Sequence, residues 1–311
     1  MLTDTPGLHH VTSLVGDPQA ALDFHVETLG LVPVKRTINH EDRMQYHFYF
    51  GTGDGAPGTL YTCFPAPHDP PGRRGRPQIT AAAFAVPPGS LDYWAERLRA
   101  RDVPVERRER FGDAVLRFED PAGTRLELVA AASPGDPNPE GPVPPEVGIR
   151  GLHGVSALPV EPYSTASVLE TLGFDYDAER EGRVRYRAPG NRATVVDLLD
   201  REGGFGREGQ GTIHHVAVRV RDEDLREWHD LFRERDLRVS RIRDRHYFRS
   251  LYVRDAGGIL IELATDGPGL TVDEPADELG SSLVLPPWEA EDRDVIERHL
   301  PPVEVPTGDD P

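Results

Sequence analysis

The chain has 311 residues, of which 37% are hydrophobic and 28% are charged, as in ordinary globular proteins. Its formal net charge of −18 argues against nucleic acid and anionic membranes as partners. No stretch approaches the ~20 apolar residues of a membrane span, and the first residues lack the basic and apolar regions of a signal peptide. With a single cysteine, Cys63, the chain cannot form an internal disulfide, so we expect a cytoplasmic protein.

Four segments of the sequence repeat one order of elements, a strand, a helix and then two or three strands. They span residues 8–64, 79–131, 152–199 and 212–265. Turn and capping signals predict the helices near residues 18–29, 91–100, 165–172 and 222–235. Stretches rich in Gly and Pro, at 66–77 and 133–145, are predicted to be linkers. The last residues, 271–311, form an acidic, Pro-rich tail.

Adjacent histidines occupy two of the four first strands. Residues 7–12 read Gly-Leu-His-His-Val-Thr, and residues 212–217 read Thr-Ile-His-His-Val-Ala. A later strand, 259–263, reads Ile-Leu-Ile-Glu-Leu and places one carboxylate in an apolar run. Two imidazoles and one carboxylate are the ligand set of a non-haem Fe(II) site with open coordination positions. The pattern therefore favours an enzyme that binds its substrate on a metal.

The repeated order resembles the βαβββ modules of the vicinal oxygen chelate superfamily, which includes glyoxalases, bleomycin-resistance proteins and extradiol dioxygenases. The resemblance covers about residues 7–266. It implies an α+β fold in which four βαβββ modules pair into two half-barrels. We expect an N-terminal domain at residues 1–140, a C-terminal domain at 141–270, and a tail at 271–311 that packs on the body.

In this superfamily the metal ligands come from the first and last strands of the modules. The first-strand positions carry His10, Ala83, Gly154 and His215, and the last-strand positions carry Thr62, Glu127, Asp197 and Glu262. Pairing the first module with the second would split the two histidines. Pairing the first with the fourth gathers His10, His215 and Glu262 in one cavity, so we predict this pairing. Glu127 then has no histidine partner, and we expect it to be structural and paired with an arginine.

The sequence is similar, more narrowly, to the ring-cleaving dioxygenases of the hydroquinone type, which include chlorohydroquinone dioxygenases. The similar stretches are 7–12, 213–217, Asp-Arg-His-Tyr-Phe-Arg-Ser-Leu-Tyr-Val-Arg at 244–254 and Leu-Pro-Pro-Trp-Glu at 285–289. The resemblance implies the metal ligands His10, His215 and Glu262. It also implies roles around the metal and substrate for a second set of residues, namely His9, Thr12, His214, Arg245 and Tyr252.

These residue types suit the implied chemistry. A nearby histidine would take the phenolic proton, Arg245 would neutralise the phenolate, and Tyr252 would donate a hydrogen bond to it. In a regular strand, however, His9 and His214 face away from the metal unless a bulge re-aims them. The alternative for Arg245 is an ion pair with Asp244 or Asp255, and the alternative for Tyr252 is strand packing.

The sequence thus predicts an Fe(II)-dependent extradiol-type ring-cleaving dioxygenase that acts on a hydroquinone, or a substituted one, with O₂. Mn(II) stays open as the metal, and so does the oligomeric state, although this fold often forms homo-oligomers. The alternatives are a catechol extradiol dioxygenase, a metal-free small-molecule binding or resistance protein, and a glyoxalase-like lyase. The two histidines with Glu262 disfavour the binder. Thr62 disfavours the lyase, because a glyoxalase I would need a stronger fourth ligand there.

Overall fold

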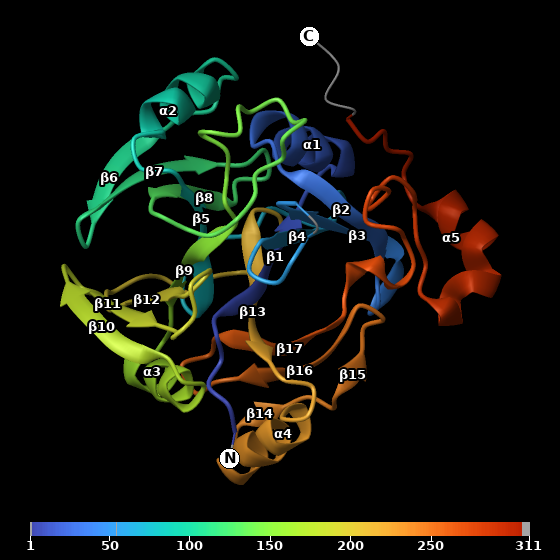
Figure 1. Ribbon diagram of the computed structural model, residues 1–311. Coiled ribbons are helices and arrows are strands. Elements are labelled where there is room, and N and C mark those ends of the chain that lie inside the picture. The colour runs from blue at the N-terminus through green and yellow to red at the C-terminus, as the bar shows by residue number, and fades with distance from the viewer. Residues whose placement is uncertain (1, 54, 307–311) are drawn as a thin grey trace.

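The computed structural model of the protein describes residues 2–53 and 55–306, and four modules follow one another in it (Figure 1). The first module contains β1 (Leu8–Val15), α1 (Pro18–Asp23) with the helical turn Phe24–Thr28, β2 (Val32–Asn39), β3 (Asp42–Gly51) and β4 (Leu60–Pro65). The second contains β5 (Gln78–Val86), α2 (Leu91–Arg99), β6 (Glu106–Arg110), β7 (Asp113–Glu119) and β8 (Arg125–Ala130).

The third module contains β9 (Leu152–Leu158), α3 (Pro162–Thr171), β10 (Asp175–Arg180), β11 (Arg183–Arg187) and β12 (Val195–Leu199). The fourth contains β13 (Thr212–Val220), α4 (Leu225–Glu234), the short strands β14 (Arg238–Val239) and β15 (Arg243–Asp244), β16 (Phe248–Arg254) and β17 (Leu260–Pro268). The tail adds the helix α5 (Arg293–His299). The predicted α+β fold of βαβββ modules is confirmed.

Local sequence explains the helices that cover the sheet. The carboxylate of Asp17 accepts the N–H of Ala20 at 2.8 Å, and Pro18 occupies the first turn of α1, which together start this helix. In α4 the buried side chains recur on one face, at Leu225, Trp228 and Phe232. Helices α1 to α4 lie at the periphery of the molecule, as Figure 1 shows, and leave the strands at the centre.

The modules pair as predicted, the first with the fourth and the second with the third. β1 runs antiparallel to β13, and β5 runs antiparallel to β9. Each first strand also lies parallel to the last strand of its own module, in the pairs β1–β4, β5–β8, β9–β12 and β13–β17. Ile213 of β13 pairs with Ile79 of β5, which helps to join the two half-barrels. The first strands, which carry the candidate ligands, therefore lie in the middle of the molecule.

A β-bulge interrupts each central pair of strands twice. In the β1–β13 ladder, His9 and His214 are the extra residues, since Leu8 and His10 pair with consecutive residues of β13, and His214 is skipped in turn. In the β5–β9 ladder the extra residues are Thr80 and His153. The register of the two ladders corrects one sequence comparison. The second-module equivalent of His215 is Ala81, which follows the bulge, and not Ala83.

The tail lies against the first module through a buried ion pair. Lys35 on β2 is almost fully buried, and its Nζ lies 2.7 Å from Asp273 and 2.5 Å from Glu274. A buried lysine needs such partners, so the two acids hold the start of the tail. Farther along, Leu285 and Ile296 are buried. The domain boundaries at residues 140 and 270 stay predictions. No helix in the described part of the chain has the length and apolar character needed to cross a membrane.

Candidate metal centre

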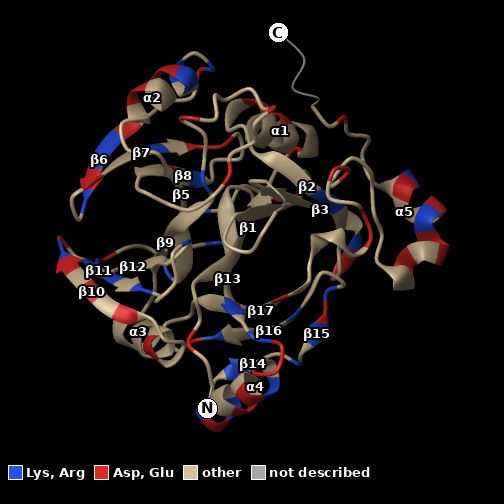
Figure 2. Cartoon of the chain, in the orientation of Figure 1, with Lys and Arg blue, Asp and Glu red and all other residues tan. Residues whose placement is uncertain are grey.

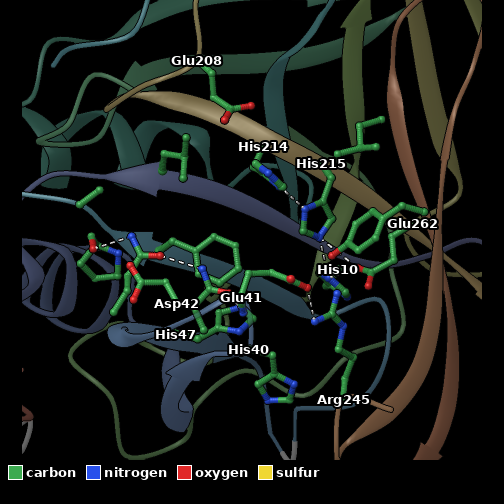
Figure 3. Close-up of a pocket in the computed structure, with 18 of the residues that line it drawn as sticks. His10, His40, Glu41, Asp42, His47, Glu208, His214, His215, Arg245 and Glu262 are labelled. Carbon is green, nitrogen blue, oxygen red and sulfur yellow. Dashed lines mark hydrogen bonds and ion pairs between the residues drawn. The ribbon is translucent and has the colours of Figure 1, made fainter. Parts of the chain in front are cut away.

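Three candidate ligand atoms converge in the half-barrel formed by the first and fourth modules (Figure 3). The Nε2 atoms of His10 and His215 lie 3.2 Å apart. Each of them lies 3.0 Å from Oε2 of Glu262. All three side chains are buried. The residues come from β1, β13 and β17, so strand pairing brings together positions that are 205 and 47 residues apart in the chain, from His10 to His215 and from His215 to Glu262.

This donor set fits a divalent cation. Two ligands that lie about 2.1 Å from an ion and at right angles are about 3 Å apart, which is the spacing observed. Oε2 of Glu262 is buried and receives no hydrogen bond from any residue in the described part of the chain. A buried carboxylate oxygen that faces two imidazole nitrogens in this way needs a positive charge between them. Two histidines and one carboxylate on one face are the ligand set of non-haem Fe(II) sites.

The electrostatics favour the ligand forms of these groups. Burial lowers the pKa of His215 to about 4, so its imidazole is neutral at neutral pH. Burial alone would raise the pKa of Glu262, but the imidazoles of His215 and His10 hold it well below its usual range. Metals bind the neutral imidazole and the ionised carboxylate. His215 and Glu262 therefore present their ligand atoms without first having to lose protons.

The two bulges turn His9 and His214 toward the candidate ligands. Nδ1 of His9 lies 3.0 Å from Nδ1 of His10, and Nδ1 of His214 lies 2.7 Å from Nδ1 of His215. If Nε2 of His10 and His215 faces a metal, the proton of each ring sits on Nδ1 and is donated to the preceding histidine. The sequence left this orientation conditional on a bulge, and the bulges are present. Each candidate ligand is thus oriented by its neighbour in the chain.

Two threonines and a third histidine form a hydrogen-bonded chain beside the ligands. The hydroxyl of Thr12 lies 3.0 Å from Nε2 of His215 and 2.8 Å from the hydroxyl of Thr62. Thr62 in turn lies 3.0 Å from Nε2 of His47 on β3. The ring of His47 is held between Tyr49 and the ring of Phe64, at 4.2 and 4.3 Å between centroids. The sequence analysis did not identify His47, although its alternation with Tyr49 on one strand was a signal.

Arg245 and Tyr252 also face this site. The ring of Tyr252 lies 5.3 Å from that of His215, and the guanidinium of Arg245 lies 5.7 Å from the centre of the Tyr252 ring. Arg245 is buried and donates to Glu41 at 3.0 Å, so neither Asp244 nor Asp255 is its partner. Burial raises the pKa of Tyr252 well above its usual value, which keeps the phenol protonated as a hydrogen-bond donor. Glu41 is a second residue that the sequence did not identify.

The ligands line a cavity of about 630 Å³. All eight residues singled out in the sequence lie in this half-barrel, and the cavity wall includes His10, His214, His215, Arg245, Tyr252 and Glu262. His9 and Thr12 are not among the residues that line the cavity, so they contact it through the residues they touch. A cavity of this size accommodates small-molecule ligands. Residues of the turn between β2 and β3, including His40 and Glu41, also line the cavity (Figure 3).

The equivalent place in the other half-barrel is filled by ion pairs. Arg110 donates to both carboxylate oxygens of Glu127, at 2.7 and 2.6 Å, and Arg117 donates to the same group at 3.1 Å. Asp197 accepts from Arg185 at 2.8 Å and from Arg183 at 3.0 Å. The predicted arginine partner of Glu127 is present. Charged residues of both signs also gather on β6, β10 and β11, as Figure 2 shows. Within the described part of the chain, this half-barrel holds no group of three side chains that could bind a metal.

Comparisons with known proteins agree with the fold. The chain matches the model of the Glyoxalase/Bleomycin resistance protein/Dioxygenase superfamily over residues 7–128 and 168–263. The crystal structure of a protein from Bacillus subtilis, described as a "putative dioxygenase", matches with a TM-score of 0.94 and 38% identity over 98% of this chain and 99% of that one. Glyoxalase I from Zea mays shares the fold, with a TM-score of 0.63 and 15% identity over 84% of this chain and 92% of that one. The chain belongs to this superfamily.

Within the superfamily, the chain is most usefully compared with two similar proteins. "Putative ring-cleaving dioxygenase MhqO" of Bacillus subtilis is 39% identical over 98% of this chain and 99% of its own. A chlorohydroquinone/hydroquinone 1,2-dioxygenase of Sphingobium indicum is 37% identical over 90% of this chain and 91% of its own. Relatives over nearly the whole chain are thus named as ring-cleaving dioxygenases, which confirms the resemblance found in the sequence and supports an oxygenase.

Proposed function

We propose that the protein is an Fe(II)-dependent, extradiol-type dioxygenase that opens the ring of a hydroquinone with O₂. The observation that carries the proposal is the convergence of His10, His215 and Glu262 at one cavity, with the Nε2 and Oε2 atoms 3.0 to 3.2 Å apart. The relatives named as ring-cleaving and hydroquinone dioxygenases support the choice of reaction and substrate. Bound at these residues, Fe(II) would lower the pKa of the substrate phenol and hold the phenolic oxygen beside O₂.

Arg245 and Tyr252 would hold the substrate oxygen. Arg245 keeps a permanent positive charge in a mostly buried position, where its attraction for a phenolate is little screened by water. Tyr252 stays protonated and can donate to the same oxygen. Both side chains line the cavity that holds the candidate ligands. The two groups would therefore orient the phenolate and favour its charged form.

The proposal gives different roles to the two histidines that flank the ligands. His214 lines the cavity, whereas His9 is buried behind His10 and has its pKa lowered to about 3, mainly by burial. Because Nδ1 of His214 accepts the proton of His215, its Nε2 carries the remaining hydrogen. His214 would then donate a hydrogen bond into the cavity. His9 would fix the orientation of His10.

We assign the uptake of the phenolic proton to His47. Burial lowers the pKa of His47 well below its usual value, so the ring is neutral at neutral pH and can accept a proton. Its Nε2 accepts from the hydroxyl of Thr62, which is itself bonded to Thr12 beside the ligands. His47 itself lines the cavity, so the phenolic proton would pass directly to the ring nitrogen that carries no hydrogen. The O–H bond of the phenol breaks as the N–H bond forms, and the imidazole holds the charge.

Oxygen-electrode assays test the function directly. Protein purified without oxygen and loaded with Fe(II) is assayed against a panel of hydroquinones and catechols, with product analysis by mass spectrometry. Oxygen uptake with incorporation of both oxygen atoms into an opened hydroquinone is expected. Faster turnover of catechols would replace the substrate assignment, and stoichiometric Fe(II) without any oxygen uptake would overturn the dioxygenase. A parallel Mn(II)-loaded sample decides which metal supports turnover.

A further inference from the structure

The charges that line the cavity are unevenly balanced. Its wall includes five carboxylates, Glu41, Asp42, Asp69, Glu208 and Glu262, and two guanidiniums, Arg243 and Arg245. Glu262 belongs to the candidate metal centre, so four carboxylates remain in the outer part of the cavity. Figure 3 shows Glu208 on one side of this outer part and Glu41 and Asp42 on another. An anionic group that enters would therefore meet like charges on opposite walls.

A single acidic residue holds both guanidiniums. Oε1 of Glu41 accepts from Arg245 at 3.0 Å and also accepts from Arg243. Glu41 lies in the turn between β2 and β3 of the first module, whereas both arginines lie at β15 of the fourth. These contacts lower the pKa of Glu41, although burial alone would raise it, so the carboxylate stays charged. Both guanidiniums therefore already face a carboxylate of the protein, and an anion that arrives in the outer cavity would compete with Glu41 for them.

We infer that the cavity selects hydroquinones with uncharged substituents, and that Glu41 excludes ring carboxylates by holding Arg243 and Arg245. The inference rests on the proposed function and adds a limit to its substrate class. A carboxylate on the ring would have to displace Glu41 from the two arginines or remain beside Asp42 and Glu208 without a cation. Both outcomes are unfavourable, because a charge moved out of water needs a partner.

Two probes that differ only in one ring substituent test the inference. Methylhydroquinone is neutral, and 2,5-dihydroxybenzoate places a carboxylate on the same ring. Dissociation constants are measured by calorimetry on the metal-loaded protein without oxygen, so that binding is read apart from turnover. We expect methylhydroquinone to bind about 100-fold more tightly than 2,5-dihydroxybenzoate, since like-charge contacts reject a wrong partner strongly.

Two neighbouring variants separate the role of Glu41 from that of the general negative field. Glu41→Gln removes one charge and releases both arginines. It should reduce the ratio of the dissociation constants of 2,5-dihydroxybenzoate and methylhydroquinone by about tenfold. Asp42→Asn removes the same charge from the next residue. Among the residues that the structure describes, however, the carboxylate of Asp42 accepts the N–H of Met44 and no arginine side chain. This variant should reduce the same ratio of dissociation constants by less than about threefold.

Equal affinity of the native protein for the two probes would overturn the inference. An unchanged ratio of the two dissociation constants in Glu41→Gln would also overturn it. If Glu41→Gln and Asp42→Asn reduce this ratio equally, the general negative charge of the cavity wall excludes the carboxylate, and the contacts of Glu41 with the arginines do not. Failure of methylhydroquinone itself to bind would instead overturn the proposed function, and the inference with it. Circular dichroism of Glu41→Gln is the control that checks whether the variant folds like the native protein.

Discussion

The two half-barrels share one strand register and hold different side chains at the same places. His10, His215, Glu262 and Thr62 in one correspond to Gly154, Ala81, Glu127 and Asp197 in the other. Both central ladders carry their bulges at the residue before the ligand position. The backbone therefore creates two equivalent sites, and only the side chains decide that one gathers metal-binding groups.

The walls around the two sites differ in a matching way. Across the last strand, Tyr252 lies opposite Glu262, and Arg117 occupies the same position opposite Glu127. Tyr49 lies opposite Thr62, whereas Arg185 lies opposite Asp197. Where the ligands are histidines the wall is aromatic, and where only carboxylates remain the wall supplies guanidiniums.

This difference shows two ways to satisfy a buried carboxylate. Glu127 is neutralised by fixed arginines, which fill the space that a ligand would need. Oε2 of Glu262 faces the imidazoles of His10 and His215, accepts no hydrogen bond within the described part of the chain, and lies at the wall of a cavity. A buried carboxylate without a cation is costly, so the first site is complete as it stands, whereas the second would be completed by a metal. The predictions below test this contrast.

The largest effect is expected from removing a candidate ligand. His10→Ala, His215→Ala or Glu262→Ala should abolish stoichiometric iron and ring cleavage, because two ligands cannot hold the ion against water. Elemental analysis and oxygen uptake measure the two losses. His153→Ala is the matched control, since His153 lies at the equivalent bulge of the other half-barrel and should keep both iron and turnover. Full iron content in His10→Ala would refute the proposed ligand set.

The second largest effect is expected from removing the proposed general base, His47, from the aromatic wall of the cavity. His47→Gln should keep iron and slow ring opening by ~10²–10⁴-fold, the usual contribution of a general base. His214→Ala and Tyr252→Phe should also keep iron and lower kcat, by smaller factors, because each removes one hydrogen bond to the substrate. Single-turnover kinetics on iron-loaded variants measure the step itself. A native rate in His47→Gln, with a larger loss in His214→Ala, would move the base to His214.

A substitution among the ion pairs of the other half-barrel should lower the stability of the protein and leave catalysis unchanged. Glu127→Gln leaves Arg110 and Arg117 without their buried partner, which should cost about 3–5 kcal/mol of unfolding free energy. Iron content and turnover should remain near native. Denaturant unfolding measures the loss, with Glu106→Gln as the control. Glu106 is an exposed partner of Arg117, and its loss should cost at most about 1 kcal/mol. If folded Glu127→Gln loses its iron, the metal binds in the half-barrel of Glu127, and the proposed ligand set is wrong.

Much of this contrast could be predicted from the sequence. The four-fold repeat located the modules, and the position of both histidines in clear first strands located His10 and His215. Glu262 stood out as a lone carboxylate in an apolar strand. Each of these signals is local, because a side chain's face follows from strand alternation.

The rest depends on pairing between distant segments. A bulge is a difference in residue count between two paired strands, so the orientation of His9 and His214 and the equivalence of Ala81 could not be read from one strand alone. His47 stands in an aromatic run from Tyr46 to Phe50 whose two faces are both buried, so its alternation with Tyr49 alone did not show which face meets the ligands. Other contacts join different modules, such as that of Arg245 with Glu41 across 204 residues.

The smallest predicted effect tests whether Arg245 serves the substrate or only Glu41. Arg245→Ala should keep iron and raise the dissociation constant for hydroquinone about tenfold, because a mostly buried cation that faces the phenolate is lost. Arg243→Ala removes the other arginine held by Glu41, but its side chain is more exposed, and the loss of affinity should be clearly smaller. Arg245→Lys should recover part of the affinity, since it restores the charge without the planar donor group. Equal losses in Arg243→Ala and Arg245→Ala would show that both arginines act only through the turn that carries Glu41. A larger loss of affinity in Arg245→Ala would extend the contrast between the half-barrels. In the half-barrel of Glu127 the guanidiniums neutralise the protein's own carboxylates, whereas in the half-barrel of Glu262 the guanidinium of Arg245 would face the substrate.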